Sequence, residues 1–161
     1  MLSERSQFVH VPLRPVPFAF PRTAVDTSVL LDVFGADPDF GERSRESLRA
    51  AYRSGALVAC DVVWPEVRAH FPEEGVFQES TELLGLRFDP IAAESAALAG
   101  RLWRELHRRS RRAAPDRSRV VADFLVGAHA LRQADVLLSR DRGFYRRCFS
   151  DLSVLDPSRR A

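Results

Sequence analysis

A short apolar run that ends at a lone aspartate limits most strongly what this chain can fold into. Residues 23–25 are Thr-Ala-Val, Asp26 follows, and Thr27 and Ser28 lead back into an apolar, periodic pattern. The pattern predicts a buried strand over about 23–26 followed by a helix that Thr27 or Ser28 could cap. In open α/β sheets, ligands lie just beyond the carboxyl ends of the strands. Asp26 therefore stands where a ligand would be held, although an aspartate here can also be a turn or capping residue.

Short apolar segments alternate with helical patterns along the rest of the chain. Further strands are expected over about 56–60, 86–88, 136–138 and 152–155. Helices are expected over about 28–34, 40–54, 62–68 (capped by Asp61 or Trp64), 76–85, 90–110 and 118–132, and directly after Asp141. This alternation implies parallel pairing through right-handed crossovers. The predicted fold is a three-layer α/β/α domain with a central, mainly parallel sheet of four to five strands.

The domain is expected to span about residues 22–157, between an N-terminal arm (1–21) and a short tail (158–161). Prolines recur in the arm from Pro12 to Pro21, which disfavours a helix and a central strand. The length fits one domain, and 45% hydrophobic with 29% charged residues fits a globular protein. No apolar run approaches the roughly 20 residues of a membrane helix or forms a signal-peptide centre. Two cysteines make no disulfide framework, so a cytoplasmic location is expected.

All 24 basic residues are arginines, and the net charge is only +2. Ten of them form two clusters: Arg101, Arg104, Arg108, Arg109, Arg111 and Arg112, and then Arg140, Arg142, Arg146 and Arg147. Arginine forks suit phosphate geometry, although a solvated helix face would explain the first cluster equally well. The absence of lysine excludes a Schiff base, a Walker-type phosphate loop and a lysine general base.

Four acids are placed so that they could meet at one edge of the sheet. Asp26 and Asp141 each follow a short apolar strand, and Glu66 stands early in the helix after the next strand. Asp123 lies among apolar positions of the helix that precedes the Asp141 strand. Carboxylates that converge repel one another, which raises a pKa or recruits a divalent cation. Oxygen ligands suit Mg²⁺ or Mn²⁺, whereas the four scattered histidines make no zinc pattern.

Each of these side chains also has an ordinary structural explanation. Asp141 could cap the helix that follows it, and Glu66 could be an exposed first-turn carboxylate. Asp123 could pair with Arg119 one helical turn away. Likewise, His129 fits a core or surface position better than a ligand position. Phe144 and Tyr145 are more typical of a core than of a base-stacking surface.

Four motifs in order resemble PIN-domain ribonucleases of the VapC toxin type. They are V-D-T-S-V-L-L (25–31), W-P-E-V (64–67), A-D-F-L-V-G-A-H-A-L (122–131) and A-D-V-L-L-S-R-D-R-G-F-Y (134–145), within about residues 22–156. The resemblance implies a parallel-sheet domain whose acidic Mg²⁺ or Mn²⁺ site cuts RNA, usually dimeric and neutralised by a small antitoxin. It carries four catalytic and metal-holding acids onto this chain: Asp26, Glu66, Asp123 and Asp141. Val67 replaces the leucine that typically follows the second acid, Ser139 replaces a threonine, and the arm is additional.

The function expected is therefore metal-dependent hydrolysis of RNA phosphodiester bonds by a toxin. Thr27, Ser28 and Ser139 would orient the acids, and Arg140, Arg142, Arg146 and Arg147 would hold RNA phosphates. The expected partners are RNA, an antitoxin and a second copy of the chain, with no membrane. The alternative is a PIN-like module that docks a protein or RNA without cutting it. A phosphotransferase or receiver domain that uses Asp26 as nucleophile is disfavoured, because such domains need a lysine.

Overall fold

A computed structural model describes residues 21–109 and 117–159, so the predicted arm lies outside the described residues apart from Pro21. The strands are β1 (Arg22–Val25), β2 (Ala56–Ala59), β3 (Leu86–Phe88), β4 (Val136–Leu138) and β5 (Val154–Leu155). The helices are α1 (Thr27–Phe34), α2 (Gly41–Ser54), α3 (Val63–Arg68), α4 (Glu74–Leu84), α5 (Ala93–Arg109), α6 (Arg117–Gln133) and α7 (Arg142–Cys148). Every expected strand and helix is present within a few residues of its predicted bounds.

The five strands form one parallel sheet in the order β3-β2-β1-β4-β5. The chain builds outward from β1 through β2 to β3, and then returns to the other side of β1 for β4 and β5. This reversal makes the gap between the ends of β1 and β4 the topological switch point, where open α/β sheets bind ligands. In the register, Val25 at the end of β1 stands beside Leu138 at the end of β4. The residues that follow these two strands are therefore neighbours.

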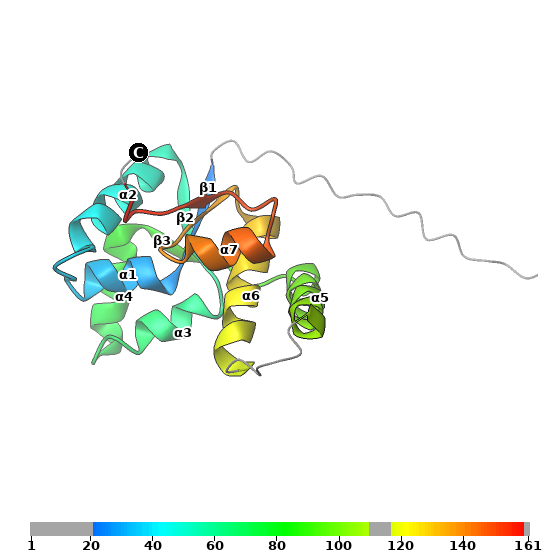
Figure 1. The fold of residues 1–161 in the computed structure, drawn as a ribbon. Coiled ribbons are helices and arrows are strands. Elements are labelled where there is room, and N and C mark those ends of the chain that lie inside the picture. Colours follow the sequence, from blue (N-terminus) through cyan, green and yellow to red (C-terminus); the bar gives the residue numbers. More distant parts are fainter. Residues whose placement is uncertain (1–20, 110–116, 160–161) are drawn as a thin grey trace, which may run out of the picture.

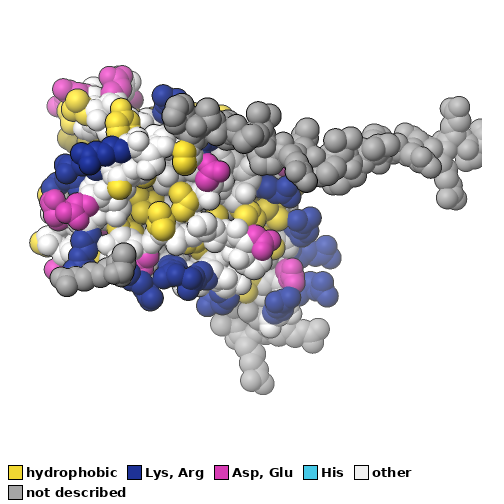
Figure 2. Space-filling model, turned by 90° about the horizontal axis from the view of Figure 1, so that it is seen from above, with side chains coloured by type: hydrophobic (Ala, Val, Ile, Leu, Met, Phe, Trp, Pro, Cys, Tyr) yellow, Lys and Arg dark blue, Asp and Glu magenta, His cyan; other side chains and the backbone are white. Residues whose placement is uncertain are grey.

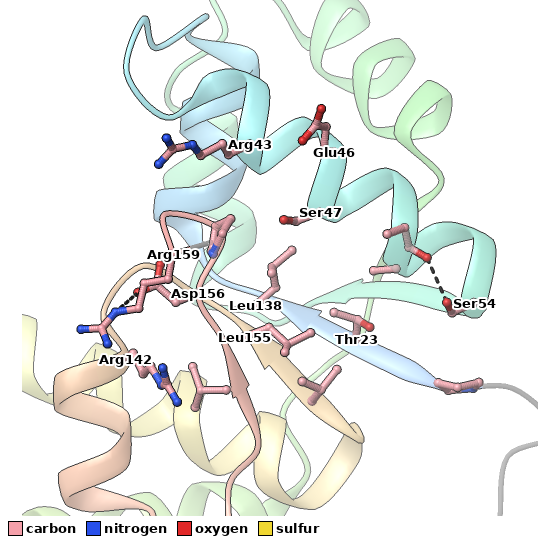
Figure 3. Close-up of a pocket in the computed structure, with 16 residues that line it drawn as sticks. Thr23, Arg43, Glu46, Ser47, Ser54, Leu138, Arg142, Leu155, Asp156 and Arg159 are labelled. Atoms are coloured by element: carbon pink, nitrogen blue, oxygen red, sulfur yellow. Dashed lines mark hydrogen bonds and ion pairs between the residues drawn. The ribbon is translucent and has the colours of Figure 1, made fainter. Parts of the chain in front are cut away.

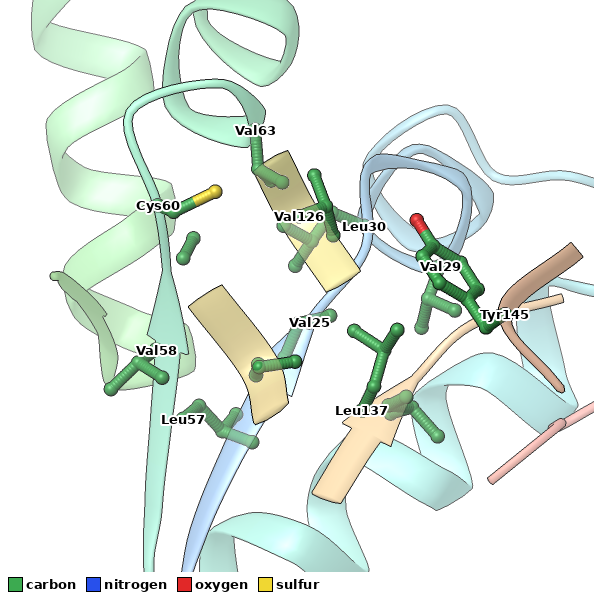
Figure 4. Close-up of a cluster of buried hydrophobic side chains, with 14 of the residues drawn as sticks. Val25, Val29, Leu30, Leu57, Val58, Cys60, Val63, Val126, Leu137 and Tyr145 are labelled. Carbon is green, nitrogen blue, oxygen red and sulfur yellow. The ribbon is translucent and has the colours of Figure 1, made fainter. Parts of the chain in front are cut away.

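Helices cover both faces of the sheet, which gives the predicted three layers (Figure 1). On one face α2 contacts β2 and α1, and on the other α6 contacts β1 and β4 while α5 packs outside α6. Figure 4 shows the core side chains between these layers, among them Val25, Leu57 and Leu137, each at most 1% exposed. Burial of such side chains from both faces is what a parallel sheet requires, and it explains the continuous apolar runs of the strands.

The structure differs from the predictions mainly at the ends of elements. Asp26 itself caps α1 through its side chain, as the alternative interpretation of this aspartate had it, so neither Thr27 nor Ser28 is the cap. The N-cap residue of α3 is Val62, which makes no side-chain cap, so the predicted cap at Asp61 or Trp64 was wrong. The Asp61 carboxylate instead accepts a 2.5 Å bond from the Ile91 amide. None of the helices in the described part of the chain is long and apolar enough to cross a membrane.

The last strand is shorter than the predicted 152–155. Leu152 belongs to the turn after α7, since its amide donates to the Phe149 carbonyl, and its side chain is buried. Pairing with β4 begins only when the carbonyl of Ser153 accepts the Leu137 amide. Apolar character alone does not separate a strand residue from a buried turn residue, so the predicted strand began two residues too early.

Candidate active site

Asp26 occupies the switch point because it is the first residue after β1. Its amide donates a 3.0 Å bond to the Leu138 carbonyl, which continues the β1–β4 ladder by one residue. Its Oδ1 atom then accepts a 2.8 Å bond from the Thr27 amide and so caps α1. The turn from strand to helix thus holds Asp26 by its backbone amide on one side and by its carboxylate on the other.

Ser139 joins Asp26 to Asp141. The fully buried Ser139 hydroxyl donates a 2.6 Å bond to Asp26 Oδ2, and the same oxygen accepts a 3.0 Å bond from the Asp141 amide. Ser28 Oγ makes a longer contact of 3.4 Å with the same carboxylate oxygen. Since Ser139 follows β4 directly, the parallel register brings it to Asp26 although 113 residues separate the two in the chain.

Glu66 is connected to Asp26 through Thr27. Glu66 lies in the first turn of α3, as predicted, and its Oε2 atom accepts a hydrogen bond from Thr27 Oγ1. The two hydroxyl neighbours of Asp26 therefore have different tasks. The Ser28 hydroxyl contacts the Asp26 carboxylate itself, whereas the Thr27 hydroxyl donates to Glu66, the acid on the helix that follows β2.

Tyr145 marks where Asp123 lies relative to the other acids. The Tyr145 ring is 1% exposed on α7, and its pKa is raised well above 10. Burial is the main cause, and the negative charges of Asp26, Asp123 and Asp141 add to it. Asp123 is therefore close enough to Tyr145 for its charge to act on the pKa of the phenol, as the charges of Asp26 and Asp141 do. Asp123 is half-buried and has an interaction partner.

The pKa of Asp26 is raised above its ordinary value. Burial is the main cause, and the nearby negative charge of Glu66 adds to it. The hydrogen bonds from Ser139, Thr27 and Ser28 act in the opposite direction and do not fully offset the burial. A buried carboxylate that is hydrogen-bonded yet still disfavoured as an anion is typical of a site that gains from a positive charge.

The donor chemistry of these acids fits a hard divalent cation, since all the donors are oxygens. In the part of the chain that the structure describes, no three His, Cys, Asp or Glu residues are grouped so that they could hold a metal ion together. The acids are instead spaced by hydroxyl groups, with Ser139 between Asp26 and Asp141 and Thr27 between Asp26 and Glu66. Three of the four predicted acids, Asp26, Glu66 and Asp141, are thus linked through hydroxyl groups at one edge of the sheet, and their convergence with Asp123 on one metal ion stays a prediction.

The four arginines expected to hold RNA are not equivalent. Arg146 and Arg147, in the last turn of α7, are exposed, and Arg142 is half-buried. The Arg140 guanidinium lies 3.0 Å from Asp32 on α1 and stacks on the Phe40 ring at 4.3 Å. Asp32 was not among the residues predicted from the sequence. The available signal was an acid inside the apolar helix that begins after Asp26.

Two expectations about core positions match the structure. His129 is 1% exposed, and its Nε2 atom lies 2.7 Å from the Asp89 carboxylate, so it is a hydrogen-bonded core residue. Burial lowers the pKa of His129, although Asp89 acts in the opposite direction. Phe144 packs against Phe124 at 5.3 Å between ring centres and is half-buried, which makes it a packing residue.

A groove of about 870 Å³ lies beside this site on the α2 face of the sheet (Figure 3). Its floor is apolar, and Figure 2 shows such side chains in the middle of one face with charged residues around them. Leu138 and Arg142 line it, whereas Asp26, Glu66, Asp123 and Asp141 do not. The groove therefore adjoins the β4 side of the site without containing its acids.

The sequence of most of the chain matches a known family model. The PIN domain model matches residues 23–150. This chain belongs to the PIN domain family. The result confirms the family resemblance drawn from the four motifs, and the matched region contains every acid of the network.

Solved structures share the fold of this PIN domain at low sequence identity. They include VapBC2 from Rickettsia felis bound to a promoter DNA fragment, with 15% identity, a TM-score of 0.63, and 84% of this chain and 98% of that chain covered. DNA-bound VapBC from Salmonella typhimurium has 15% identity, a TM-score of 0.62 and coverage of 85% and 98%. A toxin–antitoxin complex from Klebsiella pneumoniae has 17% identity, a TM-score of 0.56 and coverage of 84% and 97%. A search of curated proteins found no match.

Proposed function

We propose that this PIN domain is a Mg²⁺- or Mn²⁺-dependent endoribonuclease and the toxin of a toxin–antitoxin pair. The observation that carries the proposal is the network around Asp26. One buried carboxylate at the switch point is bonded through Ser139 to the turn of Asp141 and through Thr27 to Glu66. Such concentrated negative charge, reinforced by Asp123 near Tyr145, favours a cationic cofactor over an anionic ligand.

Asp26, Asp123, Asp141 and Glu66 would hold the cation. When bound, a divalent cation supplies a water of lowered pKa and neutralises charge that develops on phosphate oxygens. The protein's own contribution is orientation. Ser139 and Thr27 each fix one carboxylate oxygen, and the Asp26 backbone is fixed to β4. Glu66 would orient the attacking water or accept a proton from it.

Arginines on α7 would bind the phosphates of the substrate. Arg146 and Arg147 are exposed at the end of the helix that Asp141 caps, so both guanidinium groups are available to phosphates. Arg142 belongs to the same helix and lines the adjoining groove. Arg140 would contribute less to RNA binding, because its guanidinium is already paired with Asp32.

The proposed partners follow from the fold neighbours. Those structures are described as VapBC complexes with DNA and as a toxin–antitoxin complex. By analogy, this chain would be bound by a small antitoxin and would form a homodimer in the cytoplasm. Sedimentation of the purified chain tests the dimer, and rescue of growth by a co-expressed partner tests the antitoxin.

Cleavage of a labelled single-stranded RNA tests the activity. Wild type should cut it in Mn²⁺ and stop in EDTA, and Asp26→Asn should reduce the rate at least about 100-fold, as loss of a central group of a catalytic site does. Asp39→Asn is the matched control, because Asp39 is an exposed loop carboxylate outside the network. Cleavage that persists in Asp26→Asn would refute this assignment of the site.

The second candidate is a PIN module that binds without cutting. It is favoured by the spacing of the acids through hydroxyls, with no metal-holding group among the described residues. Asp26 and Asp141 also cap α1 and α7, which is a structural task that needs no metal. Tight RNA or protein binding by wild type, with no cleavage in either Mg²⁺ or Mn²⁺, would favour this candidate.

A further inference from the structure

Asp32 is a buried acid that the proposed chemistry does not use. It lies on α1, is 2% exposed, and stands between apolar neighbours of that helix. Burial of a carboxylate is costly unless hydrogen bonds and an opposite charge satisfy it. Both are present: Ser44 Oγ donates a 2.7 Å bond to Oδ2, and Arg140 lies 3.0 Å from Oδ1.

Arg140 is the middle residue of the turn that follows β4. Ser139 before it donates to Asp26, and Asp141 after it caps α7. Its guanidinium stacks on Phe40 at 4.3 Å while pairing with Asp32, so two elements outside the turn hold this side chain. A planar, forked cation is suited to such combined pairing and stacking, which a lysine could not reproduce.

Helix α1 therefore contacts the 139–141 turn at both of its ends. At its start, Asp26 receives the Ser139 hydroxyl bond. Near its other end, Asp32 receives the Arg140 guanidinium. With two attachments to α1, the turn cannot rotate about either one alone. The positions of the Ser139 hydroxyl and the Asp141 amide depend on the orientation of that turn.

We propose that Asp32 is a positioning residue that acts through Arg140 to hold Ser139 and Asp141 in place relative to Asp26. The proposal rests on the proposed nuclease function for its effect on rate, but its structural effect is independent of any activity. Arg140 is thus assigned to the architecture of the site instead of to RNA binding. Asp32 touches no substrate in this assignment.

The alternative is that the pair contributes to stability alone. The two possibilities separate because an apolar replacement of a buried ion pair is often neutral or stabilising, whereas removal of one partner is destabilising. The double variant Asp32→Leu/Arg140→Met should regain much of the stability that Arg140→Gln loses, less the contribution of the hydrogen bond from Ser44 Oγ to Asp32. The double variant still lacks the ion pair that attaches the 139–141 turn to α1.

The experiment measures kcat and KM for RNA cleavage, the melting temperature, and amide exchange at Asp141 in four proteins. These are wild type, Arg140→Gln, Asp32→Leu/Arg140→Met and the control Arg45→Gln, whose ion pair with Glu42 is on the surface. Arg140→Gln and the double variant should lower kcat about 10- to 100-fold, the scale of a misplaced catalytic group, with a smaller change in KM. Amide exchange at Asp141 should be faster in both, and Arg45→Gln should match wild type.

Recovery of kcat together with stability in the double variant would overturn the positioning role. If wild type cuts no RNA, the proposed function fails, yet the exchange measurement still decides this proposal. Unchanged exchange at Asp141 in both Arg140 variants would refute it, and faster exchange would support it.

Discussion

Ser139 Oγ donates a 2.6 Å hydrogen bond to Asp26 Oδ2 across the ends of two neighbouring strands. The parallel register of β1 and β4 creates this contact, because Val25 and Leu138 stand side by side just before it. The same hydroxyl oxygen accepts the Asp141 amide, so one small side chain sets the relation of two acids. The network at the switch point is therefore a direct consequence of the sheet order.

Removal of the Ser139 hydroxyl should destabilise the protein and disturb the site. In Ser139→Ala, the buried Asp26 carboxylate loses a donor and the Asp141 amide loses an acceptor. An unsatisfied buried group costs about 1–3 kcal/mol, so the free energy of unfolding should fall by that amount in urea titrations. Ser150→Ala, at an exposed serine, should change it by less than about 0.5 kcal/mol. Equal effects of the two substitutions would contradict the importance of this bond.

Acid should destabilise the fold through His129. Burial lowers its pKa, despite Asp89, so the native state disfavours the protonated ring that the unfolded chain adopts below about pH 6.5. The unfolded state then binds more protons, and stability falls as the pH drops from about 6.5 toward the native pKa, by up to about 1.4 kcal/mol per pH unit. Urea titrations between pH 7.5 and 5.5 measure this slope.

His129→Gln should flatten that slope while lowering stability at every pH, because Asp89 loses its imidazole partner. His70→Gln is the matched control, since His70 is exposed. If His70→Gln flattens the slope as much as His129→Gln does, the buried ring is not the origin of the effect.

Gly127 on α6 should tolerate no side chain. A Cβ atom there would lie 2.4 Å from the Phe149 ring, which is itself buried at 2% exposure. Gly127→Ala should therefore cost about 1–3 kcal/mol of stability, as overpacking does. Gly100→Ala on α5 meets nothing within 4 Å and should stabilise by about 0.5–1 kcal/mol through helix propensity. Thermal unfolding of both variants measures these opposite signs, and the same sign in both would refute the packing argument.

Loss of the α7 arginines should weaken the binding of all RNA sequences by a similar factor. Arg146→Gln and Arg147→Gln each remove an exposed charge, so the slope of log affinity against log salt should become shallower by about one for each phosphate that no longer pairs with an arginine. Binding is measured by anisotropy of a labelled RNA at several salt concentrations. Arg45→Gln on α2 supplies the control, because Arg45 is already paired with Glu42. An unchanged slope in both α7 variants would place the RNA elsewhere.

Much of this architecture follows from the sequence pattern, because strand and helix periodicities alternate clearly. Asp26, Glu66 and Asp141 could be placed at one edge of the sheet because each follows a strand or begins a helix after one. The connections between the acids could not be predicted. They depend on the β1–β4 register and on side-chain conformations, which the sequence does not encode locally.

The same limit explains Asp32 and Arg140. Arg140 stands in a basic cluster beside an expected active-site acid, so phosphate binding was the natural interpretation. Its actual partner lies on α1, far away in the sequence, and the stacking ring comes from the start of α2. Long-range pairing of this kind becomes visible only when the fold brings the elements together.

We propose that the acids around Asp26 hold a divalent cation that is needed to cut RNA. The most direct measurement compares Mn²⁺ binding, followed by calorimetry, with RNA cleavage over the same range of Mn²⁺ concentrations. We expect the two curves to coincide in wild type, and Asp26→Asn to lose both while Asp39→Asn retains both. Cleavage in EDTA would show that no metal is needed, and Mn²⁺ binding that is unchanged in Asp26→Asn would show that the metal site does not include Asp26.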